Sequence, residues 1–226
     1  MSVWSRIAEA LSALRAGESL ASVFDRLRTP PERSIAFTIA VIALGAKMAK
    51  ADGQVTRDEV TAFREIFHIP REEEANAARL FNLARQDVAG YDDYARRIAR
   101  MFDSTQGTLT DLVEGLFHIA VADGEYHASE DDFLQSVATI FGLSEREFRS
   151  IRTRFVSDAE PDPYDVLGIE PSASMKEARA AWRRLVRDSH PDRLMARGLP
   201  KEAIRLAEKR LIAVNRAWEE INERAA

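Results

Sequence analysis

Along most of the chain, apolar residues recur at intervals of three and four positions, separated by polar and charged residues. Two such series are Ile35, Ile39, Ile42 and Ala46, and Leu112, Leu116, Ile119 and Ala120. This spacing places the apolar side chains on one face of an α-helix. Strict alternation of apolar and polar residues, the signal for a strand, is nearly absent. The pattern predicts an all-α protein.

The predicted helices carry recognisable ends. Serine or threonine followed three residues later by glutamate forms a capping box, in which each side chain binds a free backbone N–H of the first turn. The pairs are Thr56/Glu59, Ser144/Glu147 and Ser174/Glu177. Gly142 and Gly198 are predicted to end helices, because glycine readily takes the left-handed conformation of a helix stop.

The N-terminal half contains a weak internal repeat. The segments KMAKADGQVTRDEV, from Lys47, and HIAVADGEYHASED, from His118, both pass from an apolar helix end through Ala-Asp-Gly into a polar turn. Each aspartate is followed at the seventh position by a glutamate, which gives the pairs Asp52/Glu59 and Asp123/Glu130. Two copies are too few for a solenoid, so we expect a pseudo-symmetric helical bundle.

A short polar segment separates this half from the rest of the chain. The segment 157–163 contains two prolines and three acidic residues, a composition typical of a short, stiff linker. We therefore predict two domains, residues 1–157 and 158–226. The second should contain helices at about Tyr164 to Leu167, Met175 to Arg187 and Lys201 to Glu223, the last two forming an antiparallel hairpin.

The charge of the chain divides at the same place. From Pro161 onward, 13 Lys+Arg stand against 11 Asp+Glu, a net +2, so the formal net charge of −5 leaves −7 for the first 160 residues. Opposite signs suggest two domains with different partners. Neither half is basic enough to indicate a nucleic-acid partner.

The composition favours a cytoplasmic protein. The chain has no cysteine, which fits a reducing compartment. Charged residues interrupt the N-terminus where a signal peptide would be apolar, and the longest uncharged run, Ser34 to Ala46, is interpreted as a buried core helix rather than a membrane span. An apolar stripe could lie on a membrane surface, although its mixed-charge polar face favours packing on the bundle: Trp4, Ile7, Leu11 and Leu14.

The predicted helix from Met175 to Arg187 has two distinct faces. Its apolar stripe is Ala178, Ala181, Trp182 and Leu185, and its cationic stripe is Lys176, Arg179, Arg183 and Arg187. The apolar stripe should pack on the rest of the domain. The cationic stripe is either a solvated face or a docking strip for an acidic surface.

The tripeptide His190-Pro191-Asp192 follows this helix. Because a proline disfavours the helical conformation of the residue before it, the helix should stop at about Ser189, and we expect an extended loop up to a new helix near Pro200. A Ser189-His190-Asp192 triad is sterically implausible, since catalytic groups must converge from separate positions. No set of nucleophile and oxyanion donors is apparent, so a hydrolase is disfavoured and we expect no enzymatic activity.

These features together resemble the J-domain of DnaJ-type co-chaperones. The matching segments are Pro163-Tyr164, Leu167-Gly168, Ala181 to Leu185, His190 to Arg193 and Asn215 to Glu219. The long loop before the last helix is similar to that of the DjlA subgroup, in which a TerB-like helical domain precedes a C-terminal J-domain. The acidic N-terminal half with its Asp-Gly repeat resembles TerB.

The resemblance implies a function in which this chain catalyses no reaction itself. In that family the His-Pro-Asp loop and the basic second helix bind a DnaK-type ATPase chaperone and stimulate ATP hydrolysis, which traps a client. Carried onto this sequence, His190, Pro191 and Asp192 are the trigger, with Arg193 beside them. The electrostatic handle is Arg183, Arg184 and Arg187, with Arg179 and Lys176 as weaker members. The N-terminal bundle would hold a client or adaptor close to the loop through the short linker.

The sequence departs from the family pattern in several places. Asp188-Ser189 stands where a basic or aromatic pair is usual, which predicts weaker docking. A Gly/Phe-rich segment, a zinc-binding client module, a fourth helix and the membrane anchor of the DjlA subgroup are all absent from the sequence, so we expect no integral membrane segment.

The acidic repeat leaves a second function open, a metal-binding stress-response protein of the TerB type with a secondary J-domain. Its candidate ligands are Asp52, Glu59, Asp123 and Glu130, and a zinc alternative uses His118, Asp123 and His127. The glycine directly follows the aspartate, unlike the EF-hand arrangement. Asp-Gly also makes tight turns between helices, so turns and helix caps are the favoured interpretation and no cofactor is expected.

Overall fold

The computed structural model describes residues 32–52, 61, 71, 74–86, 90–102, 106–156, 161–196 and 204–225. Within these ranges every regular element is a helix, which confirms the all-α prediction. The first six are α3 (Glu32–Asp52), α5 (Glu74–Gln86), α6 (Tyr91–Met101), α7 (Gln106–Ala120), α8 (Ala128–Ile140) and α9 (Glu145–Phe155). The remaining four are α10 (Pro163–Leu167), α11 (Met175–Asp188), α12 (Pro191–Ala196) and α13 (Ile204–Arg224).

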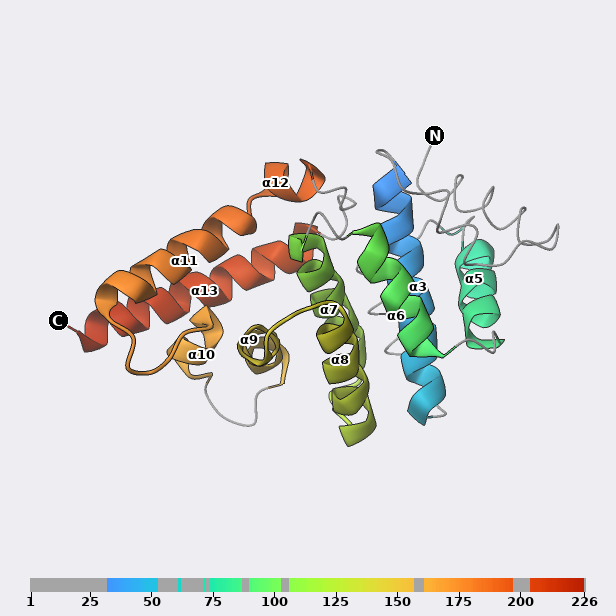
Figure 1. Ribbon diagram of the computed structural model, residues 1–226, viewed down its shortest axis with the longest axis horizontal. Helices are drawn as coiled ribbons and strands as arrows, with labels where there is room; N and C mark the ends of the chain where they lie inside the picture. Colours follow the sequence, from blue (N-terminus) through green and yellow to red (C-terminus); the bar gives the residue numbers. More distant parts are fainter. Residues whose placement is uncertain are drawn as a thin grey trace.

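Helix α3 is the centre of the N-terminal bundle, α3 to α9. It packs against α5, α6, α7 and α8 (Figure 1). Every side chain described from Thr38 to Met48 is buried, which is the behaviour of a helix surrounded by other helices. Even Lys47 is buried, and its Nζ lies 4.9 Å from the centroid of the Tyr94 ring, an aromatic partner for the charge. The prediction that the uncharged run forms a core helix is therefore confirmed.

Aromatic side chains pack α9 against α7 within the bundle. The ring of Phe117, fully buried on α7, lies with its centroid 5.5 Å from that of Phe148 and 5.8 Å from that of Phe155, both on α9. These separations fall within the favourable range for aromatic pairs. Helix α9, the last of the bundle, is thereby fixed against α7.

The C-terminal unit, α10 to α13, has a small core of its own. Helices α11 and α13 lie side by side and antiparallel, with α10 packed against both (Figure 1). Their buried residues are Val166, Leu167, Ala178, Ala181, Val214, Ala217 and Ile221. The rings of Trp182 and Trp218 stack across the hairpin with centroids 5.2 Å apart, and the Trp182 Nε1 donates to Asn215 Oδ1 at 2.9 Å. The predicted antiparallel hairpin is confirmed.

The predicted helix ends can be checked where the chain is described. Both Ser144/Glu147 and Ser174/Glu177 form complete capping boxes, and Gly142 follows α8 with φ of 77°. Thr56, Glu59 and Gly198 lie outside the described residues, as does the N-terminal apolar stripe. In the ranges that are described, no helix combines the length and apolarity needed to cross a membrane.

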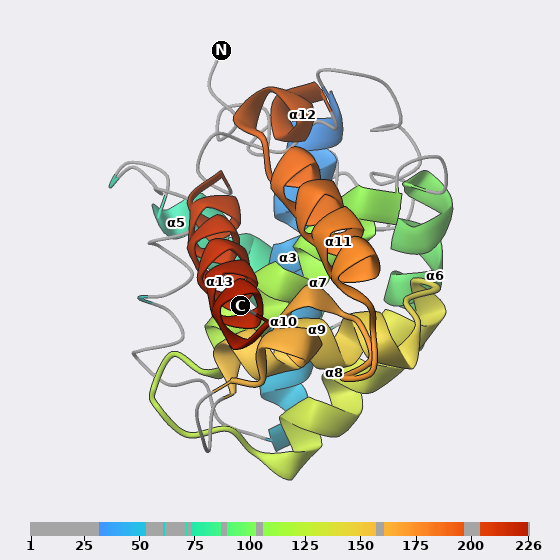
Figure 2. The same ribbon diagram turned by 90° about the vertical axis from the view of Figure 1, so that its left-hand side faces the viewer.

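The two units share a buried interface, which the sequence did not predict. Leu194 of α12 and Leu206 and Ala207 of α13 are buried in the core of the N-terminal bundle rather than in that of their own unit. Figure 2 shows α13 directed end-on toward the bundle. The predicted boundary at residue 157 stays a prediction, but the C-terminal unit is packed on the bundle and not merely tethered to it.

Helices α9 and α10 form a second part of this interface. The buried Ser150 Oγ donates to the Val166 carbonyl oxygen at 2.9 Å. Gly168 ends α10 with φ of 65°, a left-handed conformation that glycine takes readily. An exposed ion pair between Arg146 and Glu170 lies at the rim. The chain therefore enters the C-terminal unit in direct contact with the bundle.

The cap of α11 gives a testable pH dependence. The pKa of Glu177 is lowered from its ordinary value of 4.5, first by the Ser174 hydroxyl and then by the Ser174 backbone N–H. A carboxyl whose pKa is lower in the folded state stabilises the fold above its unfolded pKa, and loses that contribution as the pH falls through the folded pKa. We expect Glu177→Ala to lower the melting temperature at pH 7, and this difference from the wild type to shrink steadily below about pH 4.5.

The measurement is thermal unfolding by circular dichroism across that pH range. Glu219→Ala, at an exposed position inside α13, is the matched control and should give a difference that does not follow this titration. A Glu177→Ala difference of constant size down to the acid limit would show that the carboxylate form is not what stabilises α11.

Candidate functional site

Helix α11 presents the two faces that the sequence predicted. Ala178 and Ala181 are buried and Trp182 and Leu185 pack partly buried against the small core. The cationic residues Lys176, Arg179, Arg183 and Arg187 are all exposed. Among the described residues, no ion pair joins an acidic side chain to these four. Within this part of the chain the stripe is therefore an open positive face.

Arg184 belongs to a different surface from the stripe. It lines a cleft of about 500 Å³ between the two units, together with Arg154, Asp188 and Arg210. Its side chain is still exposed, so it can be reached from solvent. Of the predicted handle, Arg183 and Arg187 lie on the open face and Arg184 at the seam between the units.

The loop after α11 is shorter than predicted. Helix α11 ends at Asp188 with Ser189 as its cap, as expected, but α12 begins directly at Pro191 instead of an extended loop. Proline suits the first turn of a helix because its missing N–H would have no helical partner there. The backbone N–H groups of Arg193 and Leu194 donate to the His190 carbonyl at 3.0 and 3.1 Å, so His190 is held at the start of α12.

His190 and Asp192 project from this turn. Their side chains are 60% and 81% exposed, so neither contributes to a core. The Asp192 backbone N–H donates to His190 Nδ1 at 3.2 Å, while the Asp192 carboxylate lies 3.7 Å from the same nitrogen. When the imidazole is neutral, Nδ1 accepts from the backbone N–H, so Nε2 carries the hydrogen and is the donor of the ring.

An ion pair between Asp188 and Arg193 spans the tripeptide. Arg193 Nη1 lies 2.7 Å from Asp188 Oδ1, so an ion pair spans the turn from the end of α11 to α12. The sequence suggested that Asp188 weakens docking and that Arg193 contributes to it. In the structure these residues pair with each other, and Arg193 therefore acts on the shape of the turn as well as on its charge.

Ser189, the other departure from the family pattern, is buried. Its Oγ donates to the Leu185 carbonyl at 2.7 Å and accepts from Arg210 Nε at 3.0 Å. A larger basic or aromatic side chain could not occupy this position without displacing Arg210. The departure at Ser189 therefore has a local structural reason.

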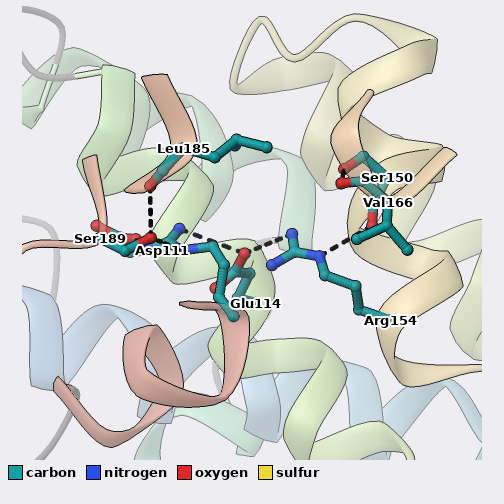
Figure 3. Close-up of polar contacts among 8 residues, drawn as sticks. Asp111, Glu114, Ser150, Arg154, Val166, Leu185 and Ser189 are labelled. Atoms are coloured by element: carbon teal, nitrogen blue, oxygen red, sulfur yellow. Dashed lines mark hydrogen bonds and ion pairs between the residues drawn. The ribbon is translucent and has the colours of Figure 1, made fainter. Parts of the chain in front are cut away.

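Arg210 connects this turn to the bundle. Its Nη1 donates to Glu114 Oε1 at 3.3 Å, and its Nη2 lies 2.9 Å from Asp111 Oδ1 as an ion pair. Both carboxylates come from α7, and all three side chains are at most 6% exposed. In Figure 3, Ser189 and Arg154 lie on opposite sides of Glu114.

The network continues from Glu114 to the other contact between the units. Arg154 Nη2 lies 2.6 Å from the same Glu114 oxygen, and Arg154 Nε donates to the Ser150 carbonyl at 3.0 Å. Ser150 is the residue that binds Val166 of α10 (Figure 3). Two guanidinium groups and two carboxylates thus form one buried, charge-balanced cluster at the interface, a composition that offsets the cost of desolvating each ion.

The pKa directions agree with this geometry. Burial would lower the pKa of the Arg210 guanidinium, but the carboxylates of Glu114 and Asp111 outweigh burial and raise it. Burial dominates at Arg154 and lowers its pKa, because it shares Glu114 with Arg210. Both groups remain cationic at neutral pH, since arginine is the strongest base among the side chains. Arg210 is the better compensated of the two.

Sequence reasoning missed Arg210, Asp111, Glu114 and Ser189. One signal was present: Asp111 and Glu114, three residues apart, interrupt the otherwise apolar run of α7. Acidic residues on an apolar helix face require buried cations as partners. The identity of the cation could not be read, because Arg210 is 96 residues from Glu114 along the chain.

The candidate metal ligands are used differently or are not described. Glu130 is buried and accepts the His127 backbone N–H at 2.9 Å at the start of α8, and Asp123 accepts from the Glu125 backbone N–H at 3.0 Å. Glu59 and the side chain of Asp52 lie outside the described residues. Where side chains are described, no three His, Asp or Glu side chains are grouped closely enough to hold a metal ion, so the structure does not bring His118, Asp123 and His127 together.

In comparisons with known proteins, each half of the chain matches a family model. The family model of the tellurite resistance protein TerB matches residues 38–153, and that of the DnaJ domain matches residues 162–225. Proteins called "Co-chaperone protein DjlA" are similar over most of the chain. The one from Photobacterium profundum is 27% identical across 85% of this chain and 79% of its own length. The one from Coxiella burnetii is 28% identical across 78% and 73%. No solved structure matches the chain.

The geometry at His190 predicts its tautomer. Because Nδ1 accepts from the Asp192 backbone N–H, neutral His190 should carry its hydrogen on Nε2. Nitrogen-15 NMR of the histidine side chains above their titration range distinguishes the two tautomers by the shifts of the ring nitrogens. A neutral His190 with its hydrogen on Nδ1 would mean that this hydrogen bond is not formed in solution.

Proposed function

We propose that this chain, which belongs to the TerB family and carries a DnaJ domain after its TerB region, is a co-chaperone whose DnaJ domain binds a DnaK-type ATPase and stimulates ATP hydrolysis. The relatives named as co-chaperones support this assignment, since they match 85% of the chain and not one domain alone. The observation that carries the proposal is the exposed pair His190 and Asp192, presented at the end of the open cationic face of α11.

The proposed mechanism requires no bond-making in this chain. Rate acceleration comes from differential binding, in which the turn favours the ATP-hydrolysing conformation of the partner over its other states. His190 offers a hydrogen-bond donor at Nε2 and Asp192 a carboxylate, and Pro191 together with the Asp188–Arg193 ion pair reduces the freedom of the turn. A preorganised turn loses little entropy on binding.

The cationic residues have a separate task in this proposal. Lys176, Arg179, Arg183 and Arg187 form an open positive face that complements an acidic partner surface, which raises the rate of encounter and fixes orientation. Arg184 contributes from the seam between the two units. Arg193 contributes through the turn that it stabilises.

The TerB region is proposed to hold a client or adaptor protein in the cytoplasm. The first 160 residues carry a net charge of −7, opposite in sign to the +2 of the remainder, so the two halves favour different partners. A client bound by the bundle would lie within the same molecule as the turn at His190, which raises its effective concentration near the recruited ATPase. The proposed partners include neither nucleic acid nor the interior of a membrane.

Substitution of the turn tests the central claim. We expect the full chain to accelerate single-turnover ATP hydrolysis by a DnaK-type chaperone, and His190→Gln or Asp192→Asn to return the rate constant to the partner's basal value. Both side chains are exposed, so the folded state should change in stability by no more than about 0.5 kcal/mol. His127→Gln, which alters an exposed histidine of the bundle, is the matched control and should stimulate as the wild type does. Normal stimulation by the His190 variant would disprove the proposed trigger.

Charge reversal tests the role of the cationic face. Arg183→Glu combined with Arg187→Glu should slow association with the partner, measured by stopped-flow fluorescence, and wild-type association should slow as salt shortens the Debye length below about 8 Å. Arg205→Glu with Arg216→Glu reverses the same number of charges at exposed positions of α13 and is the control. Equal slowing by both pairs would assign the effect to net charge and not to this face.

A further inference from the structure

The turn that carries His190 is attached to the TerB bundle at both ends. On its N-terminal side, Ser189 accepts from Arg210, whose other two nitrogens lie against Glu114 and Asp111 of α7. On its C-terminal side, the Leu194 side chain is fully buried in the core of the bundle. The four residues in between, His190 to Arg193, are all exposed to solvent. The position of the turn is therefore determined by contacts outside its own unit.

The position of the turn depends on the geometry of the Arg210 guanidinium group as well as on its charge. The guanidinium group is a rigid planar fork, and here each of its three nitrogens faces a different group. Ser189 Oγ gives its single hydrogen to the Leu185 carbonyl, so its remaining lone pairs are available to Arg210 Nε. A shift of α7 relative to α13 would consequently move the last turn of α11.

We propose that Arg210 is a positioning residue for the His190-Pro191-Asp192 turn, and that Asp111 and Glu114 of the TerB region hold it in place. The inference rests on the proposed co-chaperone function and deepens it. The TerB region is then a structural part of the ATPase-stimulating device, besides any client that it holds. A purely adhesive role for the cluster would need only opposite charges across the interface, which Arg146 and Glu170 also provide at its rim.

The conservative variant Arg210→Lys separates these roles in the full chain. A lysine keeps the positive charge beside Asp111 and Glu114, but its single ammonium group cannot also supply the Nε donor to Ser189. Ser189→Ala removes the same hydrogen bond from the other side, and Glu114→Gln weakens the hold on Arg210 from the bundle. Glu170→Gln removes an ion pair across the same interface away from the turn and is the matched control.

The first measurement needs no partner protein. Hydrogen exchange of the Asp192 backbone N–H, which binds His190 Nδ1, reports the order of the turn. We expect exchange about tenfold faster in Arg210→Lys and in Ser189→Ala, the factor corresponding to the net contribution of one hydrogen bond. The double variant should be no faster than either single variant, because both substitutions break the same contact. Glu170→Gln should exchange as the wild type does.

The second measurement separates maximal stimulation from affinity. In single-turnover ATP hydrolysis at increasing concentrations of each variant, the maximal rate constant should fall about tenfold, since small displacements can be costly where a site acts by orientation. The half-saturating concentration should stay unchanged, because the cationic face is intact. Glu114→Gln should shift both the exchange and the maximal rate in the same direction as Ser189→Ala, although it lies in the other family region.

These readouts distinguish failure of the inference from failure of the proposed function. If the wild type does not stimulate any DnaK-type ATPase, the proposed function is wrong, and the exchange of the Asp192 amide still decides whether Arg210 orders the turn. Wild-type exchange and maximal rate in Ser189→Ala and Arg210→Lys would overturn the inference. An effect of the same size in Glu170→Gln would also overturn the inference, because the slower hydrolysis and faster exchange would then result from a general weakening of the interface. Should Arg210→Lys fail to fold, Ser189→Ala and Glu114→Gln decide the outcome.

Discussion

The buried cluster of Arg210, Asp111 and Glu114 is the constraint on which the architecture depends. Two carboxylates lie inside an otherwise apolar helix of the bundle, and a charge removed from water is tolerated only beside a well-placed opposite charge. Leaving such a group without its partner typically costs about 3–5 kcal/mol. That is a large part of the roughly 5–15 kcal/mol that stabilises a whole domain. Arg154 of α9 also pairs with Glu114, so the bundle supplies part of this compensation and Arg210 of α13 supplies the rest. The two family regions are therefore joined by energetics as well as by the chain.

Helix α13 shows how one element serves both units. Its first turns contribute Leu206 and Ala207 to the core of the bundle, and its later turns contribute Val214, Ala217 and Ile221 to the small core with α10 and α11. Arg210 lies between these two sets, at the place where the environment of the helix changes. Helix α11 packs on α10 and α13 through its apolar stripe, and its cationic stripe stays exposed.

Features that are determined by residues close together in the sequence could be predicted. The stripes of α11, the capping boxes at Ser144 and Ser174, and the core role of α3 all follow from spacing within one helix, and the structure confirms them. Helix α12 was missed because Pro191 was interpreted as part of a loop. What makes a helix of this short segment is tertiary: Leu194 is buried in the other unit, a contact that no local pattern encodes. Ser189 was interpreted as a weakening departure for the same reason, since its partner Arg210 is 21 residues away.

The sharing of α13 bears on how such proteins can change through recombination. A DnaJ domain exchanged as a unit would bring foreign residues to the positions of Leu194, Leu206 and Arg210, and the bundle would face them with a hydrophobic opening and with Asp111 and Glu114 deprived of Arg210. A recombined protein would then be stable only if α7 were exchanged together with the DnaJ domain, or if residues on both sides of the interface were substituted together. Recombination at the linker alone would therefore separate Leu194 and Arg210 from the residues of the bundle that they contact.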